Sequence, residues 1–188
     1  MQQASTESAA DRFWLAVGGL KLPGKLALAV VSGFSYWWIG DIKDDLGWFD
    51  WSWHLIGAIF GALVMAPYVA ASNYRLLRAL AMCIASATIY HYTIVLVSDG
   101  PFSVDTNTPW LVFGGSAALL TGLSTWVLAP LKFHLTLIPL TLVAGALGGG
   151  AYHWIPLSGD DPKLSVVHFA WQVLVCLALH FGLRPAVK

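Results

Sequence analysis

LSVVHFAWQVLVCLALHFGL, residues 164–183, is a stretch without a single Asp, Glu, Lys or Arg. A helix of about 20 residues spans the ~30 Å hydrocarbon core of a bilayer. Five further apolar stretches of similar length precede it, at residues 24–40, 53–72, 77–97, 110–130 and 134–155. The sequence therefore predicts an all-α membrane protein, a single bundle of six transmembrane helices.

The composition excludes several other classes of protein. Of the 188 residues, 57% are hydrophobic and only 11% are charged, whereas about a quarter of the residues in a soluble domain are charged. So little charge cannot cover a globule in water. A soluble enzyme, a disordered chain and a nucleic-acid-binding protein are therefore disfavoured, and the lipid bilayer is the expected partner.

The chain divides into a short N-terminal arm, residues 1–23, and the transmembrane domain, residues 24–188. Residues 13–20 are apolar, but Lys21, Pro23 and Lys25 separate them from the first long stretch. We expect a short interfacial helix there, lying on the membrane. Residues 1–11, MQQASTESAAD, carry none of the basic groups that begin a signal peptide, so we do not expect a cleaved one.

The charged residues alternate between the two ends of the predicted helices. Eight of the ten basic residues fall on the N-terminal arm, the second and fourth connections and the C-terminus, which share one side of a six-span bundle: Arg12, Lys21, Lys25, Arg75, Arg78, Lys132, Arg184 and Lys188. Eight acids fall on the other side: Asp41, Asp44, Asp45, Asp50, Asp99, Asp105, Asp160 and Asp161. Because Lys and Arg accumulate in short cytoplasmic loops, we expect a multi-pass protein of the plasma (inner) membrane with both termini in the cytoplasm.

Small residues recur at helix-packing intervals in three of the stretches. They are Gly57 and Gly61 in the second, Gly114, Ala118 and Gly122 in the fourth, and Gly145 with the run 148–150 in the fifth. Small residues let helices approach closely in lipid, so we expect these three helices to form one tightly packed centre. Three consecutive glycines exceed what one packing face needs. Pro67 and Pro139 can kink their helices.

Signs of catalysis are missing from the sequence. No charged residue lies in the middle of a predicted span, where proton-coupled pumps often carry one, and neither a nucleophile elbow nor His-Glu-x-x-His is present. Cys83 and Cys176 lie within spans and are expected to be buried thiols. We expect no enzymatic activity, and the sequence requires no cofactor.

Histidines and tryptophans gather toward the acidic side. His54, His91, His153 and His168 project toward the outer half of their stretches, while His134 and His180 lie at the inner side. Seven of the ten tryptophans also lie on the acidic side: Trp37, Trp38, Trp48, Trp51, Trp53, Trp110 and Trp154. An aromatic belt at the lipid headgroups accounts for the tryptophans. It accounts less well for the histidines, because a belt predicts such residues at both membrane interfaces, whereas most of the histidines lie at one.

Two polar stripes point to a candidate site. Ser165, His168, Gln172 and Cys176 follow one another at intervals of three and four, which places them on one helix face. Ser86, Tyr90 and Thr93 form a similar face in residues 77–97. One possibility is that the two stripes face each other and form interhelical hydrogen bonds, with no further role. They could also line an outward-open polar cavity, whose expected lining residues are His91, His168, Gln172, Tyr90, His54 and His153.

Three functions remain open for such a cavity. The first is a small transporter or solute-binding membrane subunit for a polar solute or a cation, which the aspartates would attract. The second is a non-catalytic accessory or assembly subunit of a membrane complex. The third is a His-ligated metal or haem protein, in which His91 and His168 would be the first candidate ligands. Of these we expect the first.

Overall fold

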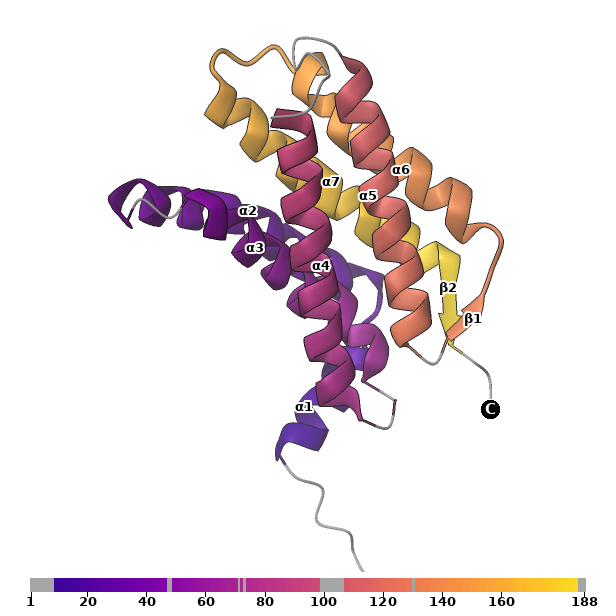
Figure 1. Cartoon of the computed structure of the whole chain (residues 1–188). Helices are drawn as coiled ribbons and strands as arrows, with labels where there is room; N and C mark the ends of the chain where they lie inside the picture. Colours follow the sequence, from indigo (N-terminus) through magenta and orange to yellow (C-terminus); the bar gives the residue numbers. More distant parts are fainter. Residues whose placement is uncertain are drawn as a thin grey trace, which may run out of the picture.

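The computed structural model describes residues 9–46, 49–70, 72, 74–98, 107–129 and 131–185 of the chain, and these are almost entirely helical (Figure 1). In chain order the helices are α1 (Ala9–Gly18), α2 (Leu22–Leu46), α3 (Phe49–Phe60), η1 (Gly61–Met65), η2 (Ala66–Val69), α4 (Arg75–Ser98), α5 (Asn107–Leu128), α6 (Leu137–Trp154) and α7 (Asp160–Gly182). Two three-residue strands, β1 (Leu131–Phe133) and β2 (Leu183–Pro185), form an antiparallel pair. The all-α prediction is confirmed.

Each of the six predicted apolar stretches is helical. Within the described residues, four segments are long and apolar enough to cross a membrane: Trp51–Val69, Arg75–Val97, Asn107–Leu128 and Pro162–Gly182. The bent pair α1 and α2 counts as a fifth if it is one broken span. These helices are compatible with a membrane protein. α6 is not among these segments because its run of glycines and its last residues, His153 and Trp154, lower its mean hydropathy. The arrangement with six spans therefore stays a prediction.

The N-terminal helices do not form one straight rod. α1 and α2 meet at 101°, so α1 is a separate short helix, and Gly18 at its end lies against Ala70 after η2. α2 and α3 pack against each other and extend sideways from the group formed by α4, α5, α6 and α7 (Figure 1). Whether these helices form the predicted single bundle of six transmembrane spans stays a prediction.

The helix that begins with α3 changes its winding at its C-terminal end. It passes into the π-helix η1 and then into the 3-10 helix η2, which contains Pro67. Proline has no N–H to donate to the carbonyl four residues earlier, so regular α-helical bonding fails there. The helix therefore changes its winding around Pro67, the residue at which a kink was expected.

The segments that carry the basic residues gather at one end of the molecule. Arg78 Nη1, near the start of α4, donates to the carbonyl of Leu128 at the end of α5, at 3.2 Å. The ladder of β1 and β2 follows directly, with Lys132 opposite Arg184 in the backbone register. Figure 1 shows α1, β1 and β2 at this same end. The described basic segments therefore lie together, Lys188 lies outside the described residues, and which side of a membrane these segments face stays a prediction.

Gly57 and Gly61 pack directly against α4. A Cβ on Gly57 would lie 2.7 Å from the carbonyl oxygen of Ser86, and one on Gly61 would lie 2.7 Å from the Cα of Cys83. These distances are shorter than any ordinary carbon contact. The second predicted stretch is therefore held to the third, backbone against backbone.

The glycines of α5 and α6 form a separate contact. A Cβ on Gly114 would lie 2.5 Å from the carbonyl oxygen of Gly145, and one on Gly149 would overlap the carbonyl oxygen of Trp110. The three glycine-containing stretches thus do not share the single centre that the sequence suggested. They form two interfaces, because Gly57 of α3 and Gly61 of η1 face α4, whereas Gly114 of α5 faces Gly145 and Gly149 of α6.

The run of glycines at 148–150 serves three different contacts. Gly148 lies against the backbone of Trp171 in α7, Gly149 against Trp110 in α5, and Gly150 under the ring of Trp154 in its own helix. Consecutive residues of an α-helix point about 100° apart. Three small residues in a row therefore let α6 approach α7 and α5 and leave room for its own Trp154 ring, which explains the run by packing alone.

Candidate functional site

The polar stripe of α7 is buried inside the protein. Ser165, His168, Gln172 and Cys176 are all at most 6% exposed. α2 runs along this stripe in the opposite direction, since Cys176 Sγ donates to the carbonyl of Lys25 at 3.6 Å while the ring of His168 stacks on Tyr36. The stripe therefore faces protein and not lipid.

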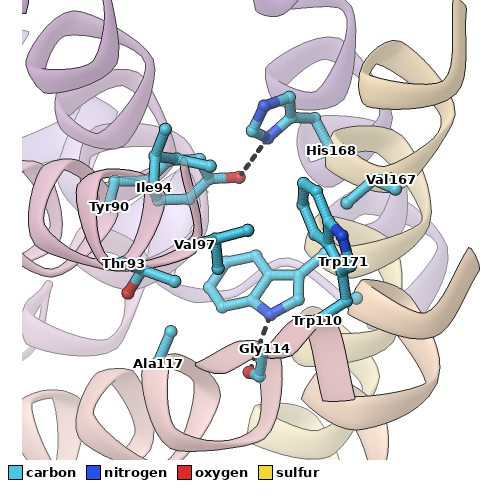
Figure 2. A pocket seen from close by; sticks show the side chains of 11 residues that line it. Tyr90, Thr93, Ile94, Val97, Trp110, Gly114, Ala117, Val167, His168 and Trp171 are labelled. Carbon is cyan, nitrogen blue, oxygen red and sulfur yellow. Dashed lines mark hydrogen bonds between the residues drawn. The ribbon is translucent and has the colours of Figure 1, made fainter. Parts of the chain in front are cut away.

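The polar faces of α4 and α7 meet at Tyr90. Gln172 Nε2 donates to the Tyr90 hydroxyl oxygen at 3.0 Å, and the same hydroxyl lies 3.4 Å from His168 Nδ1. Figure 2 shows the Tyr90 hydroxyl pointing across the gap between the two helices at the imidazole. The expectation that the two stripes face each other is met at these three residues.

Aromatic rings surround the imidazole of His168. Its centroid lies 4.8 Å from the ring of Tyr36 in α2, 5.4 Å from Trp53 in α3 and 5.5 Å from Tyr90 in α4. Four helices thus contribute to one cluster, and His168 is only 2% exposed. Side chains from α2, α3 and α4 therefore hold the ring in place.

Four polar atoms in this region are buried without a hydrogen-bond partner. They are His168 Nε2 and Gln172 Oε1 on α7, and the hydroxyl oxygens of Ser32 and Ser35 on α2. Ser35 is next to Tyr36 in the chain, and Ser32 is one turn away from it. A buried polar group left unpaired costs about 1–3 kcal/mol. The cluster therefore has an unmet capacity for hydrogen bonds that a bound molecule could satisfy.

A small cavity borders the cluster on the side of α5 and α6. Its volume is about 40 Å³, and its lining comes from four helices: Tyr90, Thr93, Ile94, Val97, Trp110, Gly114, Ala117, Gly149, Val167, His168 and Trp171 (Figure 2). Trp171 closes one wall, because its Nε1 donates to the carbonyl of Gly114 at 3.0 Å. The lining is mainly apolar, with Tyr90 and His168 as its hydrogen-bonding side chains at the cluster.

The structure divides the predicted site residues into separate groups. Tyr90, His168 and Gln172 come together as described. His91 stacks instead on His54, with ring centroids 4.0 Å apart, and His153 lies edge-on to Tyr152 at the end of α6. None of these three outer histidines lines the 40 Å³ cavity. Whether any of the six predicted residues binds a ligand stays a prediction.

Sequence reasoning missed the contribution of α2 and α3. Tyr36, Ser32 and Ser35 lie in the first apolar stretch and Trp53 in the second. Ser32 and Tyr36 are four residues apart, a polar pair on one helix face, and this spacing was the available signal. Trp53 was expected in the aromatic belt but is 5% exposed and in contact with His168.

The predicted belt of tryptophans consists of two different groups. Trp37, Trp38, Trp51 and Trp154 are more than half exposed, as a lipid-facing belt requires. Trp53 and Trp110 are buried, and the ring of Trp110 stacks on Tyr152 at 4.3 Å. These two are part of the packed interior, so the belt prediction is wrong for them. Trp48 lies outside the described residues.

The side chains in the described segments offer no ready-made metal centre. No group of three or more His, Cys, Asp or Glu side chains there is close enough to hold an ion. Cys176 is buried, as expected, and Cys83 is only partly buried; both are free thiols. The side chains of the predicted rim of aspartates lie outside the described part of the structure.

Comparison of the chain with protein families, with characterised proteins and with solved structures gives no match. The functional argument therefore depends on the geometry of the site.

Proposed function

We propose that the protein is a small transporter or solute-binding membrane subunit, and that the cluster of Tyr90, His168 and Gln172 binds a small polar solute. The observation that carries this proposal is the set of unpaired polar atoms on the facing helices α2 and α7. Deep inside an apolar protein such atoms are costly. A bound solute offsets that cost, whereas a helix contact that only needed to pack would be more stable with apolar side chains.

The proposal includes the arrangement in the membrane. Six spans with both termini in the cytoplasm place the basic segments at the inner face, in agreement with the distribution of Lys and Arg. The cluster then lies toward the outer half of α4 and α7. Tyr90 and His168 are each less than half a helix length from the end that carries the acidic connections.

Solute flux into proteoliposomes tests the proposal. Vesicles with the wild-type protein are mixed with small polar solutes such as urea, acetamide or glycerol, and reswelling is followed by light scattering. We expect faster entry of at least one solute than into protein-free vesicles. His168→Phe should return that rate to the protein-free value, because Phe keeps the ring volume but removes both nitrogens.

His134→Phe is the matched control, because His134 is a partly buried histidine between β1 and α6 that does not line the cavity. It should leave the flux unchanged. Wild-type vesicles that behave like empty ones for every solute would contradict transport. Copurification with another membrane protein at a fixed ratio would then favour the accessory alternative.

A further inference from the structure

We infer that the ligand of this cluster is a compact, neutral molecule that both donates and accepts one hydrogen bond, such as a carboxamide. The inference rests on the proposed function and narrows it to a chemical class. Three properties of the cluster carry it: the direction of its hydrogen bonds, the absence of formal charge on the side chains around it, and the small space beside it.

The hydrogen bonds of Tyr90 determine which groups remain open. Gln172 Nε2 donates to the Tyr90 oxygen, so the single hydroxyl hydrogen of Tyr90 is left to point at His168 Nδ1. Nδ1 is then the acceptor of a neutral imidazole, whose proton must be on Nε2. The unpaired atoms of α7 are therefore a donor, His168 Nε2–H, and an acceptor, Gln172 Oε1.

Exchanging the oxygen and nitrogen of the Gln172 amide does not change this result. The Tyr90 hydroxyl would then donate to Gln172 and accept from Nδ1–H of His168. The open atoms would be an acceptor on His168 and a donor on Gln172. In both orientations α7 presents one donor and one acceptor, one helical turn apart. A ligand that only accepts, or only donates, leaves one of them unpaired.

The surroundings favour an uncharged ligand. The rings around His168 belong to Tyr36, Trp53 and Tyr90, and none of the 11 residues drawn around the cavity in Figure 2 carries a formal charge. A buried ion without a counter-charge loses its hydration and gains little in return. A cation or a carboxylate would therefore bind more weakly here than its neutral isostere.

The space beside the cluster limits the size of the ligand. A cavity needs roughly 10–15 Å³ to hold one water molecule by the same kind of measure. The cavity next to Tyr90 and His168 has about 40 Å³, which is room for about three waters. A molecule of a few heavy atoms fits beside His168, and a sugar or an amino acid does not. Gln172 does not line this cavity, so a ligand that also pairs with Gln172 must displace side chains of the cluster.

Nitrogen NMR of histidine-labelled protein in detergent micelles tests the class directly. Acetamide, acetone and acetate have equal numbers of heavy atoms, but acetone and acetate only accept hydrogen bonds and acetate is charged. The His168 Nε2 signal is identified as the one that is absent from the spectrum of His168→Phe. We expect acetamide to shift this signal. Acetone should bind about tenfold more weakly, since one buried group stays unpaired, and acetate should not bind.

Two tyrosines of α4 provide the matched variants. Tyr90→Phe removes the hydroxyl that orients His168, so the two tautomers should mix and acetamide affinity should fall about tenfold. Tyr92→Phe removes an exposed hydroxyl two residues away and should change neither. The ranking of the three probes on the wild-type protein remains decisive if Tyr90→Phe does not fold.

The outcomes separate the two proposals. If acetone or acetate shifts His168 as strongly as acetamide, the ligand class is wrong and solute binding at the cluster stands. If none of the three probes moves the His168 signals while a larger or a charged solute, added as a further probe, does, the class is also wrong. If no solute moves them, both proposals are overturned.

Discussion

The imidazole of His54 lies flat against that of His91, with ring centroids 4.0 Å apart and planes inclined by 21°. This stack joins α3 to α4 on the same interface as the contact of Gly57 with Ala87. Two histidines that were expected to line a cavity thus contact each other's faces. In this arrangement they hold two helices together.

A double-mutant cycle measures that contact. We expect His54→Ala and His91→Ala to couple by about 0.5–1.5 kcal/mol, the range found for aromatic pairs. The free energy of unfolding of both single variants and the double variant in detergent gives the coupling. His91→Phe should keep most of it, because a phenyl ring can still stack. If the losses in unfolding free energy of the two single variants add up to that of the double variant, the stack of His54 on His91 does not stabilise the protein.

Enlarging Gly57 of α3 or Gly61 of η1 should separate this segment from α4. Gly57→Leu and Gly61→Leu place side chains where the backbone of Ser86 and Cys83 lies. Each should lower the free energy of unfolding by about 2 kcal/mol or more, which thermal melting in detergent detects. Leu80→Ala on the exposed face of α4 is the control and should cost less. Glycine variants that melt like the wild type would contradict this interface.

The three consecutive glycines should differ in their tolerance of a methyl group. Gly149→Ala and Gly148→Ala meet backbone atoms of Trp110 and Trp171, which cannot move aside. Gly150→Ala meets only the outer ring atoms of Trp154, which is half exposed and can turn away. Melting temperatures should therefore fall clearly for the first two, by the equivalent of about 1–3 kcal/mol, and little for the third. The reverse order would refute the packing explanation.

Cysteine labelling tests the orientation of the chain. Single cysteines at Ser72 and Thr106, in a background without Cys83 and Cys176, should react with an impermeant thiol reagent from opposite sides of the membrane. The reason is that α4 separates them if it crosses the bilayer. Thr106 lies outside the described residues, but its place in the chain suffices. Labelling of both positions from outside would contradict the proposed topology.

Local patterns predicted the elements and part of the site. Apolar length alone placed all six long helices, because each must satisfy its own backbone in an apolar environment. Intervals of three and four on α7 identified His168 and Gln172, and the same rule on α4 identified Tyr90. The contact between the two polar faces could be expected because a polar helix face in an apolar protein is unfavourable against lipid and is more stable against another polar face.

Neighbour identity could not be predicted in the same way. Periodicity shows which residues share a face but not which helix covers it, so nothing in the sequence paired His91 with His54 or placed Tyr36 over His168. The two groups of tryptophans show the same limit. Trp51 and Trp53 are two residues apart, yet one is 71% exposed and the other 5%, because only one of them faces α2 and α7.

The missing Cβ atoms between α5 and α6 have a mechanical consequence. Where two helices touch through their backbones, no side chain between them can change rotamer to allow one helix to slide along the other. We therefore expect α5, α6 and the part of α7 against Gly148 to move as one rigid body. α2 and α3 contact His168 through aromatic side chains, which can re-pack. Gly57 and Gly61 hold their segment to α4 in the same backbone-to-backbone way. Admission of a molecule to the cluster would then begin with a rearrangement of these aromatic side chains and not with sliding of the helices.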